Sequence, residues 1–140
     1  MTSTTLHGSC LCGTVRYTVT GTPTRFMHCH CSRCRKATGT GHASNLFFDP
    51  GTLAMTTGAD QVRAYKVPEA LRFSNSFCTV CGSRVPYQRQ NGAATVVVVP
   101  AGSLDEEPPI RPQARIFQDS RAAWSCAGDG IATFAQYVQG

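Results

Sequence analysis

The sequence has no long apolar run. Its longest uninterrupted aliphatic stretch, Val96 to Val99, is far too short to cross a bilayer, and the segment from Met1 to Cys10 lacks the apolar core of a signal peptide. We therefore expect a cytoplasmic protein that does not interact with membranes. No long polar or low-complexity stretch divides the 140 residues into two folding units, so we expect a single domain spanning residues 1–140.

Charge of one sign is not concentrated in any part of the chain. The 13 Lys and Arg and 8 Asp and Glu give a formal net charge of +5, but no run of five or more like charges occurs. The sequence also lacks the basic stripe with interleaved aromatic residues that is typical of nucleic-acid-binding domains. We expect no nucleic-acid partner, whereas a small acidic substrate is compatible with the positive excess. The pattern does not indicate an oligomeric state.

Short alternating segments predict a mainly β fold. Val15, Tyr17 and Val19 alternate with polar residues, which is the period-two pattern of a half-buried strand within Thr14 to Thr20. Further strands are predicted at Asn45–Phe48, Val62–Val67, Leu71–Phe77, Arg84–Tyr87, Thr95–Val99 and Arg115–Phe117, with turns at Asp49-Pro50-Gly51, Thr57-Gly58 and Asn91-Gly92.

Two helices are predicted as well. Ser32 is expected to cap a short helix that ends at Gly39. The segment Ile131 to Val138 follows Asp129 and carries apolar residues at the i, i+3, i+4, i+7 spacing of one helical face, which predicts a C-terminal helix. Prolines between Glu106 and Pro112 indicate an extended connector.

Eight cysteines are the most informative residues of the sequence. Thiols in a reducing compartment are not expected to pair as structural disulfides, and metal binding is the usual alternative. Two pairs of cysteines are each followed directly by a glycine, where a tight turn aims both sulfurs at one metal. Zinc prefers four tetrahedral ligands in a structural site, so we predict that the two pairs complete one another. The ligands of this closed zinc site would be Cys10, Cys12, Cys78 and Cys81.

A second group places three thiols within six residues, at Cys29, Cys31 and Cys34. If the chain is extended here, Cys29 and Cys31 share one face and His28 and His30 take the other, so neither histidine is the natural fourth ligand. Three protein ligands with one open position are typical of catalytic zinc. The sequence therefore predicts two zinc ions per chain, the second in an open site.

Two other interpretations of these three thiols stay open. A protein side chain such as His28, His30 or His42 could close the site into a structural one. Alternatively, the Cys31 to Cys34 pair has the CxxC spacing of thiols that exchange disulfides. The isolated Cys126 is interpreted as a small buried hydrophobe rather than a ligand.

Basic residues accompany the three thiols. Arg33, Arg35 and Lys36, together with the positive N-terminal end of the short helix, favour thiolates at this place. The same side chains are candidate contacts for the carboxylates of an acidic thiol such as glutathione. The alternative is that they form an ordinary solvated helix face.

Four ordered motifs carry a resemblance to a known family. They are Gly8–Gly13 with Val15–Tyr17, His28–Lys36, Phe77–Ser83 and Ala101–Asp105, and they span nearly the whole chain. Together they resemble the glutathione-dependent formaldehyde-activating enzyme (GFA) family, which also includes centromere protein V. The resemblance implies a β-tent, in which several small coiled β-sheets meet around zinc.

The resemblance also implies a division of labour between the motifs. The first and third would hold a structural zinc through Cys10, Cys12, Cys78 and Cys81, and the middle one a catalytic zinc through Cys29, Cys31 and Cys34. The implied activity is the condensation of glutathione with formaldehyde to S-hydroxymethylglutathione, the reverse of a carbon–sulfur lyase reaction. The chain departs from the family pattern near its end, where Arg115 and Ala123 replace a histidine and a proline. This departure leaves the substrate and the role of Arg115 open.

The sequence thus predicts a zinc-dependent carbon–sulfur lyase-type enzyme that acts on an adduct of a small-molecule thiol. The alternative is a zinc-stabilised binding module without turnover. The fourth ligand of the second zinc distinguishes them, because an enzyme leaves that position to water or substrate and a module closes it with a side chain.

Overall fold

The protein is mainly β, as the sequence predicts. The computed structural model describes residues 2–125 and 130–138. Its strands are β1 (Thr4–Ser9), β2 (Arg16–Cys29), β3 (Ala43–Thr57), β4 (Val62–Lys66), β5 (Ser74–Cys78), β6 (Tyr87–Asn91), β7 (Ala94–Pro100) and β8 (Ala114–Ile116). The helices are α1 (Ser32–Thr38) and the 3₁₀ turns η1 (Ala59–Gln61), η2 (Ala101–Ser103) and η3 (Gln118–Ser120).

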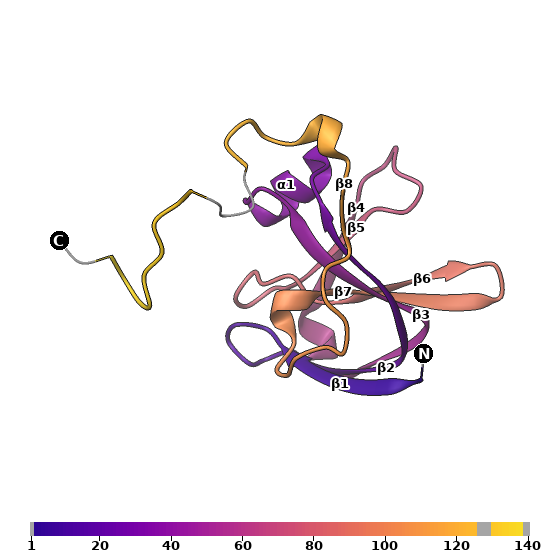
Figure 1. Cartoon of the computed structure of the whole chain (residues 1–140). Coiled ribbons are helices and arrows are strands. Elements are labelled where there is room, and N and C mark those ends of the chain that lie inside the picture. The colour runs from indigo at the N-terminus through magenta and orange to yellow at the C-terminus, as the bar shows by residue number, and fades with distance from the viewer. Residues whose placement is uncertain (1, 126–129, 139–140) are drawn as a thin grey trace.

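The strands form two sheets that meet at an angle (Figure 1). The larger has the order β1-β2-β3-β7-β6, and the smaller pairs β4 with β5. One edge of β2 is shared, because β1 pairs with its first half and β8 pairs in parallel with Met27–Cys29 at its end. β2 therefore places the segment that enters α1 directly beside the late segment of the chain that contains β8.

β3 is longer than the sequence suggests. It continues through Asp49-Pro50-Gly51, so the turn predicted there is wrong. Gly51 lies opposite Gly21 of β2, and a Cβ at Gly21 would collide with the carbonyl oxygen of Pro50. The two glycines let the strands approach closely, so the chain bends at this point without leaving the sheet.

The apolar interior is divided into three clusters. The largest joins side chains of β1, β2, β3 and β7, and the other two are built around cysteines. In small cores of this kind, a metal ion held by the thiols would add to the free energy of folding. The clusters are Leu6, Tyr17, Val19, Phe26, Leu46, Phe48, Val97 and Val99; Cys10, Val15, Cys78 and Val85; and Cys29, Cys34 and Ala43.

The first and last motifs of the sequence pack against each other. Gly8 pairs with Tyr17 across β1 and β2, and a Cβ at Gly8 would collide with the ring of Tyr17. The Tyr17 hydroxyl lies 2.6 Å from Ser103 Oγ, and burial raises the pKa of Tyr17 to about 12. The glycine of β1 therefore makes room for a buried tyrosine that connects β2 to the segment around Ser103.

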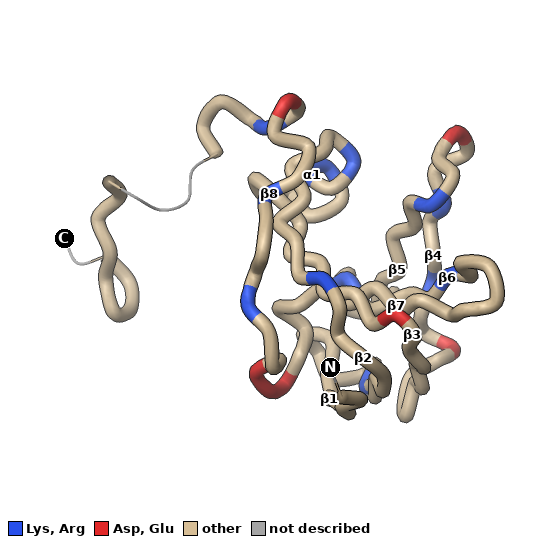
Figure 2. Tube along the Cα trace, turned by 45° about the vertical axis from the view of Figure 1, so that its right-hand side comes forward, with Lys and Arg blue, Asp and Glu red and all other residues tan. Residues whose placement is uncertain are grey.

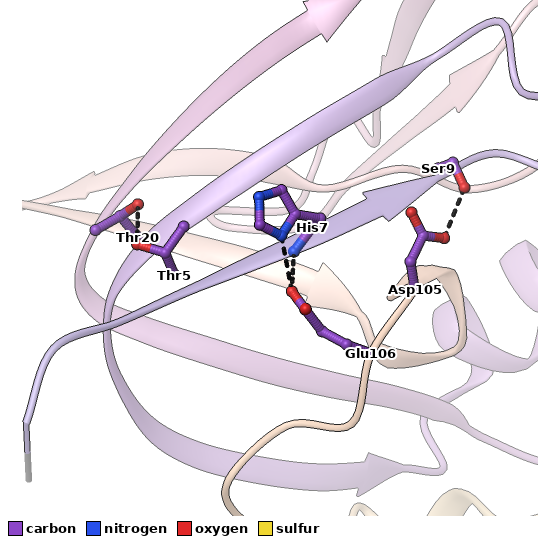
Figure 3. A network of polar contacts seen from close by, with 6 residues as sticks. All are labelled: Thr5, His7, Ser9, Thr20, Asp105 and Glu106. Atoms are coloured by element: carbon purple, nitrogen blue, oxygen red, sulfur yellow. Dashed lines mark hydrogen bonds and ion pairs between the residues drawn. The ribbon is translucent and has the colours of Figure 1, made fainter.

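Polar contacts continue this attachment at the surface (Figure 3). Ser9 Oγ donates to Asp105 Oδ1 at 2.7 Å, and the backbone amide of His7 donates to Glu106 Oε1 at 2.6 Å. The ring Nδ1 of His7 lies 2.9 Å from the same Glu106 oxygen. These bonds hold the start of the proline-containing connector along β1, and that connector has no regular secondary structure, as predicted.

The short helix forms with a different cap from the predicted one. Cys31, not Ser32, is the N-cap, and its sulfur accepts a hydrogen bond from the Cys34 amide at 3.3 Å. Serine is a preferred N-cap because its hydroxyl accepts a hydrogen bond from a free amide in the first helical turn. The Cys31 sulfur accepts the same kind of bond from the amide three residues later. The helix ends at Gly39, with φ of 74°, as predicted.

The predicted C-terminal helix is wrong. Residues 130–138 have no regular secondary structure and run away from the sheets (Figure 1), with Phe134 56% exposed and Tyr137 86% exposed. A short apolar-faced segment without a surface to pack on does not gain enough to form a helix. Asp129 and Cys126 lie outside the described residues. Within the described part of the chain, no helix has the length and apolarity that a membrane crossing requires.

Candidate metal centres and the cavities beside them

The first group of cysteines, here called the quartet, consists of Cys10, Cys12, Cys78 and Cys81. All four sulfurs lie within 4.8 Å of one another. The Sγ atoms of Cys10 and Cys12 are 3.6 Å apart, and those of Cys12 and Cys78 are 4.0 Å apart. Tetrahedral zinc with bonds of about 2.3 Å requires sulfur–sulfur separations of about 3.8 Å. The quartet therefore has the composition and spacing of a closed zinc site.

Two equivalent turns aim the quartet sulfurs. Gly13 has φ of 79° and donates its amide to the Cys10 carbonyl at 3.1 Å. Gly82 has φ of 78° and donates to the Cys78 carbonyl at 2.7 Å. This left-handed conformation suits glycine and folds each turn tightly around its two thiols. The repeated glycine in the sequence thus corresponds to repeated geometry.

Hydrogen bonds favour a thiolate in the quartet. Ser83 Oγ lies 3.3 Å from Cys81 Sγ. Hydrogen bonds from the Ser83 side chain and then from its backbone lower the pKa of Cys81 to about 5. A sulfur that is already ionised near neutral pH releases little or no proton when it binds a metal, which favours metal binding.

The second group, here called the trio, consists of Cys29, Cys31 and Cys34, whose sulfurs also lie within 4.8 Å of one another. Cys29 is the last residue of β2, Cys31 caps α1, and Cys34 is the buried residue of that helix. A hydrogen bond from Cys34 lowers the pKa of Cys29 to about 6, and the same bond raises the pKa of Cys34. The described residues place no histidine ligand atom within the trio.

A large cavity of about 850 Å³ lies beside the trio. Phe73 and Ile116 pack against the cluster of Cys29, Cys34 and Ala43, and both also line the cavity. The described lining contains four arginines and one acidic residue, Glu69, so the cavity is electropositive. The arginines are Arg33, Arg72, Arg84 and Arg89.

The predicted basic residues divide in the structure. Arg33 lines the cavity, whereas Arg35 and Lys36 are absent from its described lining. Lys36 is exposed, and Arg35 is half-buried on the same helix. Figure 2 shows Lys and Arg spread over α1, the smaller sheet and the segment around β8, without a continuous stripe.

Three cavity arginines were not candidates in the sequence. Arg84 is positioned by a hydrogen bond from its Nε to Asn75 Oδ1 at 2.8 Å. Arg72 lies in the connection between β4 and β5, and Arg89 lies in β6. These arginines are far from the trio in the sequence, so no local motif predicts that they line its cavity. They reach it only because the smaller sheet and β6 fold against the trio.

The three histidines near the trio, His28, His30 and His42, line a different cavity from the trio. The rings of His28 and His42 stack with centroids 4.0 Å apart, and those of His30 and His42 are 5.1 Å apart. Burial, followed by the charge of His42, holds the pKa of His28 and of His30 below the usual range. The three histidines and Arg115 line a separate cavity, whereas Ile116 and Phe117, which follow Arg115 in the sequence, line the trio cavity.

Comparisons with known proteins agree with these observations. The family model described as glutathione-dependent formaldehyde-activating enzyme matches residues 5–120. A Halomonas elongata protein, provisionally assigned as a glutathione-dependent formaldehyde-activating enzyme, is 41% identical over 83 residues, covering 56% of this chain. The alignment spans about half (52%) of that relative.

The fold has a counterpart among solved structures. The crystal structure of a Rhodobacter sphaeroides protein superposes with a TM-score of 0.53, over 79% of this chain and 99% of the other, at 21% identity. At that identity the likeness concerns the fold alone. The extent of the family match, together with the order of its motifs along the chain, shows that this protein belongs to the glutathione-dependent formaldehyde-activating enzyme family.

Proposed function

We propose that the protein is an enzyme that forms or breaks a carbon–sulfur bond in an adduct of a small thiol, such as glutathione, with an aldehyde, such as formaldehyde. The observation that carries the proposal is the difference between the two cysteine groups. The quartet has four sulfurs, enough to close a tetrahedral zinc site, whereas the trio has three and lies beside a cavity of about 850 Å³. Family membership supports the same reaction class.

The donor sets fit two zinc ions per chain. Cys10, Cys12, Cys78 and Cys81 would hold a structural ion, and Cys29, Cys31 and Cys34 would hold a catalytic one. When bound at the trio, zinc would supply Lewis acidity, which favours the ionised form of a thiol or polarises a carbonyl oxygen. In the condensation a carbon–sulfur bond forms and the thiol proton ends on the aldehyde oxygen.

The protein side chains around the trio would bind and orient the substrate. Arg33 and Arg84 line the cavity, and guanidinium groups bind carboxylates in two parallel hydrogen bonds. Glutathione carries two carboxylates at a distance from its thiol. Holding them fixes the thiol next to the trio and supplies the proximity that a bimolecular condensation otherwise lacks.

The buried side of the trio has a different role. Cys29 and Cys34 are 6% and 4% exposed, and Phe73 and Ile116 pack against them. This apolar packing shields the reacting atoms from water on one side and strengthens electrostatic interactions there. The cavity mouth is then the side from which both reactants approach.

The test is a measurement of thiol–aldehyde exchange with the zinc-loaded protein. NMR exchange spectroscopy would follow glutathione, formaldehyde and S-hydroxymethylglutathione at equilibrium, where a catalyst increases the exchange rate without changing the populations. We expect Cys31→Ser to remove the acceleration. Arg84→Gln should raise the KM for glutathione about tenfold or more but change the rate with a neutral thiol such as 2-mercaptoethanol little.

Arg63→Gln is the matched control, because Arg63 is exposed on β4 and should not affect exchange. No acceleration by wild-type protein carrying two zinc ions, for either thiol, would contradict the proposed enzyme. Saturable glutathione binding without acceleration would favour the zinc-stabilised binding module instead.

A further inference from the structure

A second, smaller cavity lies behind the trio, on the opposite face of the end of β2. Its volume is about 140 Å³, room for about four or five water molecules. Side chains alternate along an extended chain, so Cys29 faces the trio while His28 and His30 face this cavity. Its described lining is His28, His30, His42, Arg115, Gln118, Arg121 and Ser125, and contains no carboxylate.

The cavity is assembled from distant parts of the chain. His28 lies beside Arg115 in the parallel pairing of β2 with β8, and the His30 amide donates to the Ile116 carbonyl at 2.9 Å. Ser125 also lines the cavity, and its Oγ lies 3.5 Å from His30 Nδ1. A Cβ at Gly41 would lie 2.7 Å from Ser125 Oγ, so the glycine lets that segment approach.

Polar groups in this cavity lack partners among the described residues. His30 is 4% exposed, and its Nε2 atom is buried without a hydrogen bond from any described group. Neither Arg115 nor Arg121 takes part in an ion pair within residues 2–125 and 130–138. Arginines without a described carboxylate partner favour a bound anion at this cavity.

The geometry disfavours a metal ion as that ligand. The rings of His28 and His42 are stacked with only 12° between their planes, so their nitrogens do not converge on one point. Two arginines at the same cavity would also repel a cation. An anion is favoured instead. Guanidinium, amide and hydroxyl groups donate hydrogen bonds, and the charged side chains in the described part of the lining are arginines.

We propose that this cavity binds a small oxyanion, of the phosphate or carboxylate class, with Arg115 and Arg121 as its charged contacts and Gln118, Ser125 and the histidine rings as further polar contacts. The site is distinct from the trio and does not depend on the proposed reaction. Its volume limits the ligand to a single phosphate or a short carboxylate. A peptide-sized thiol such as glutathione is too large to be enclosed there.

The test is calorimetric titration of the zinc-loaded protein with inorganic phosphate and, in a second arm, with acetate, at constant ionic strength. We expect saturable binding at one site per chain for at least one of the two anions, and the tighter one identifies the ligand class. Arg115→Gln and Arg121→Gln should each weaken that binding about tenfold or more, the effect of losing a charge-assisted hydrogen bond. Arg63→Gln should leave it unchanged.

The Cys31→Ser variant separates this site from the trio. It should bind the anion with the affinity of the wild-type protein, because Cys31 does not line the cavity. The proposal is overturned if neither anion binds saturably, or if both arginine variants bind as tightly as wild type. Loss of binding in Cys31→Ser alone would place the anion at the trio and would also overturn it.

Discussion

Replacing Cys81 with serine removes one sulfur of the quartet, and replacing Cys31 with serine removes one sulfur of the trio. The quartet joins Cys12 to Cys78, which are 66 residues apart in the sequence, and its members Cys10 and Cys78 belong to a core cluster with Val15 and Val85. We expect Cys81→Ser to unfold the protein. A structural zinc contributes on the order of 10 kcal/mol, about as much as the whole stability of a small domain.

Cys31→Ser should have a much smaller effect on stability. The trio anchors α1, a helix of 7 residues, and the largest core cluster contains none of its members. Serine is also a preferred N-cap, so its hydroxyl can replace the sulfur that accepts the Cys34 amide hydrogen bond. We expect a loss of about 1 to 2 kcal/mol, which corresponds to a decrease of several degrees in Tm.

Zinc content per chain, circular dichroism and thermal unfolding measure both effects on protein purified without added metal. The expected result is two zinc ions in wild type, one in a folded Cys31→Ser protein, and an unfolded or strongly destabilised Cys81→Ser protein. The Cys31→Ala variant, which loses the cap as well, should be about 1 kcal/mol less stable than Cys31→Ser. Equal destabilisation by Cys81→Ser and Cys31→Ser would refute the assignment of separate structural and catalytic roles.

Three other predictions concern the fold. Between about pH 10 and 12 the buried Tyr17 keeps a proton that the unfolded chain has released, so the free energy of unfolding should fall by up to about 1.4 kcal/mol per pH unit. Denaturant titrations should show a shallower fall for Tyr17→Phe, and an equal slope in the two proteins would contradict this. Gly8→Ala should destabilise the protein by about 1 to 3 kcal/mol, because the added Cβ would collide with the Tyr17 ring. The control Gly102→Ala should change the denaturation midpoint little, because a Cβ there meets no atom within 4 Å. Similar midpoints in the two variants would argue against this packing. Phe134→Ala should alter the unfolding free energy by less than about 0.5 kcal/mol, since that side chain is 56% exposed, and a larger loss would mean that residues 130–138 pack on the protein.

The sequence alone determined the features that depend on neighbouring residues. The glycine after each quartet pair permits the left-handed turns seen at Gly13 and Gly82, so the grouping of four thiols could be predicted from local chemistry. The alternation of Cys29 with His28 and His30 likewise follows from an extended chain, and it separated the thiols from the histidines correctly.

Features that depend on distant segments were decided only by the tertiary structure. Alternation shows that Cys29 and His30 face opposite sides, but not which residues meet them there. Parallel pairing of β8 with β2 brings Arg115 to the histidines, and the smaller sheet and β6 bring Arg84 to the trio. The apolar period of residues 131–138 predicted a helix, yet a short amphipathic segment folds only where a partner surface covers its apolar face. The spacing of residues in the sequence determines local turns and which side of a strand a side chain faces. Which segments pack against each other depends on the free energy of packing the whole chain.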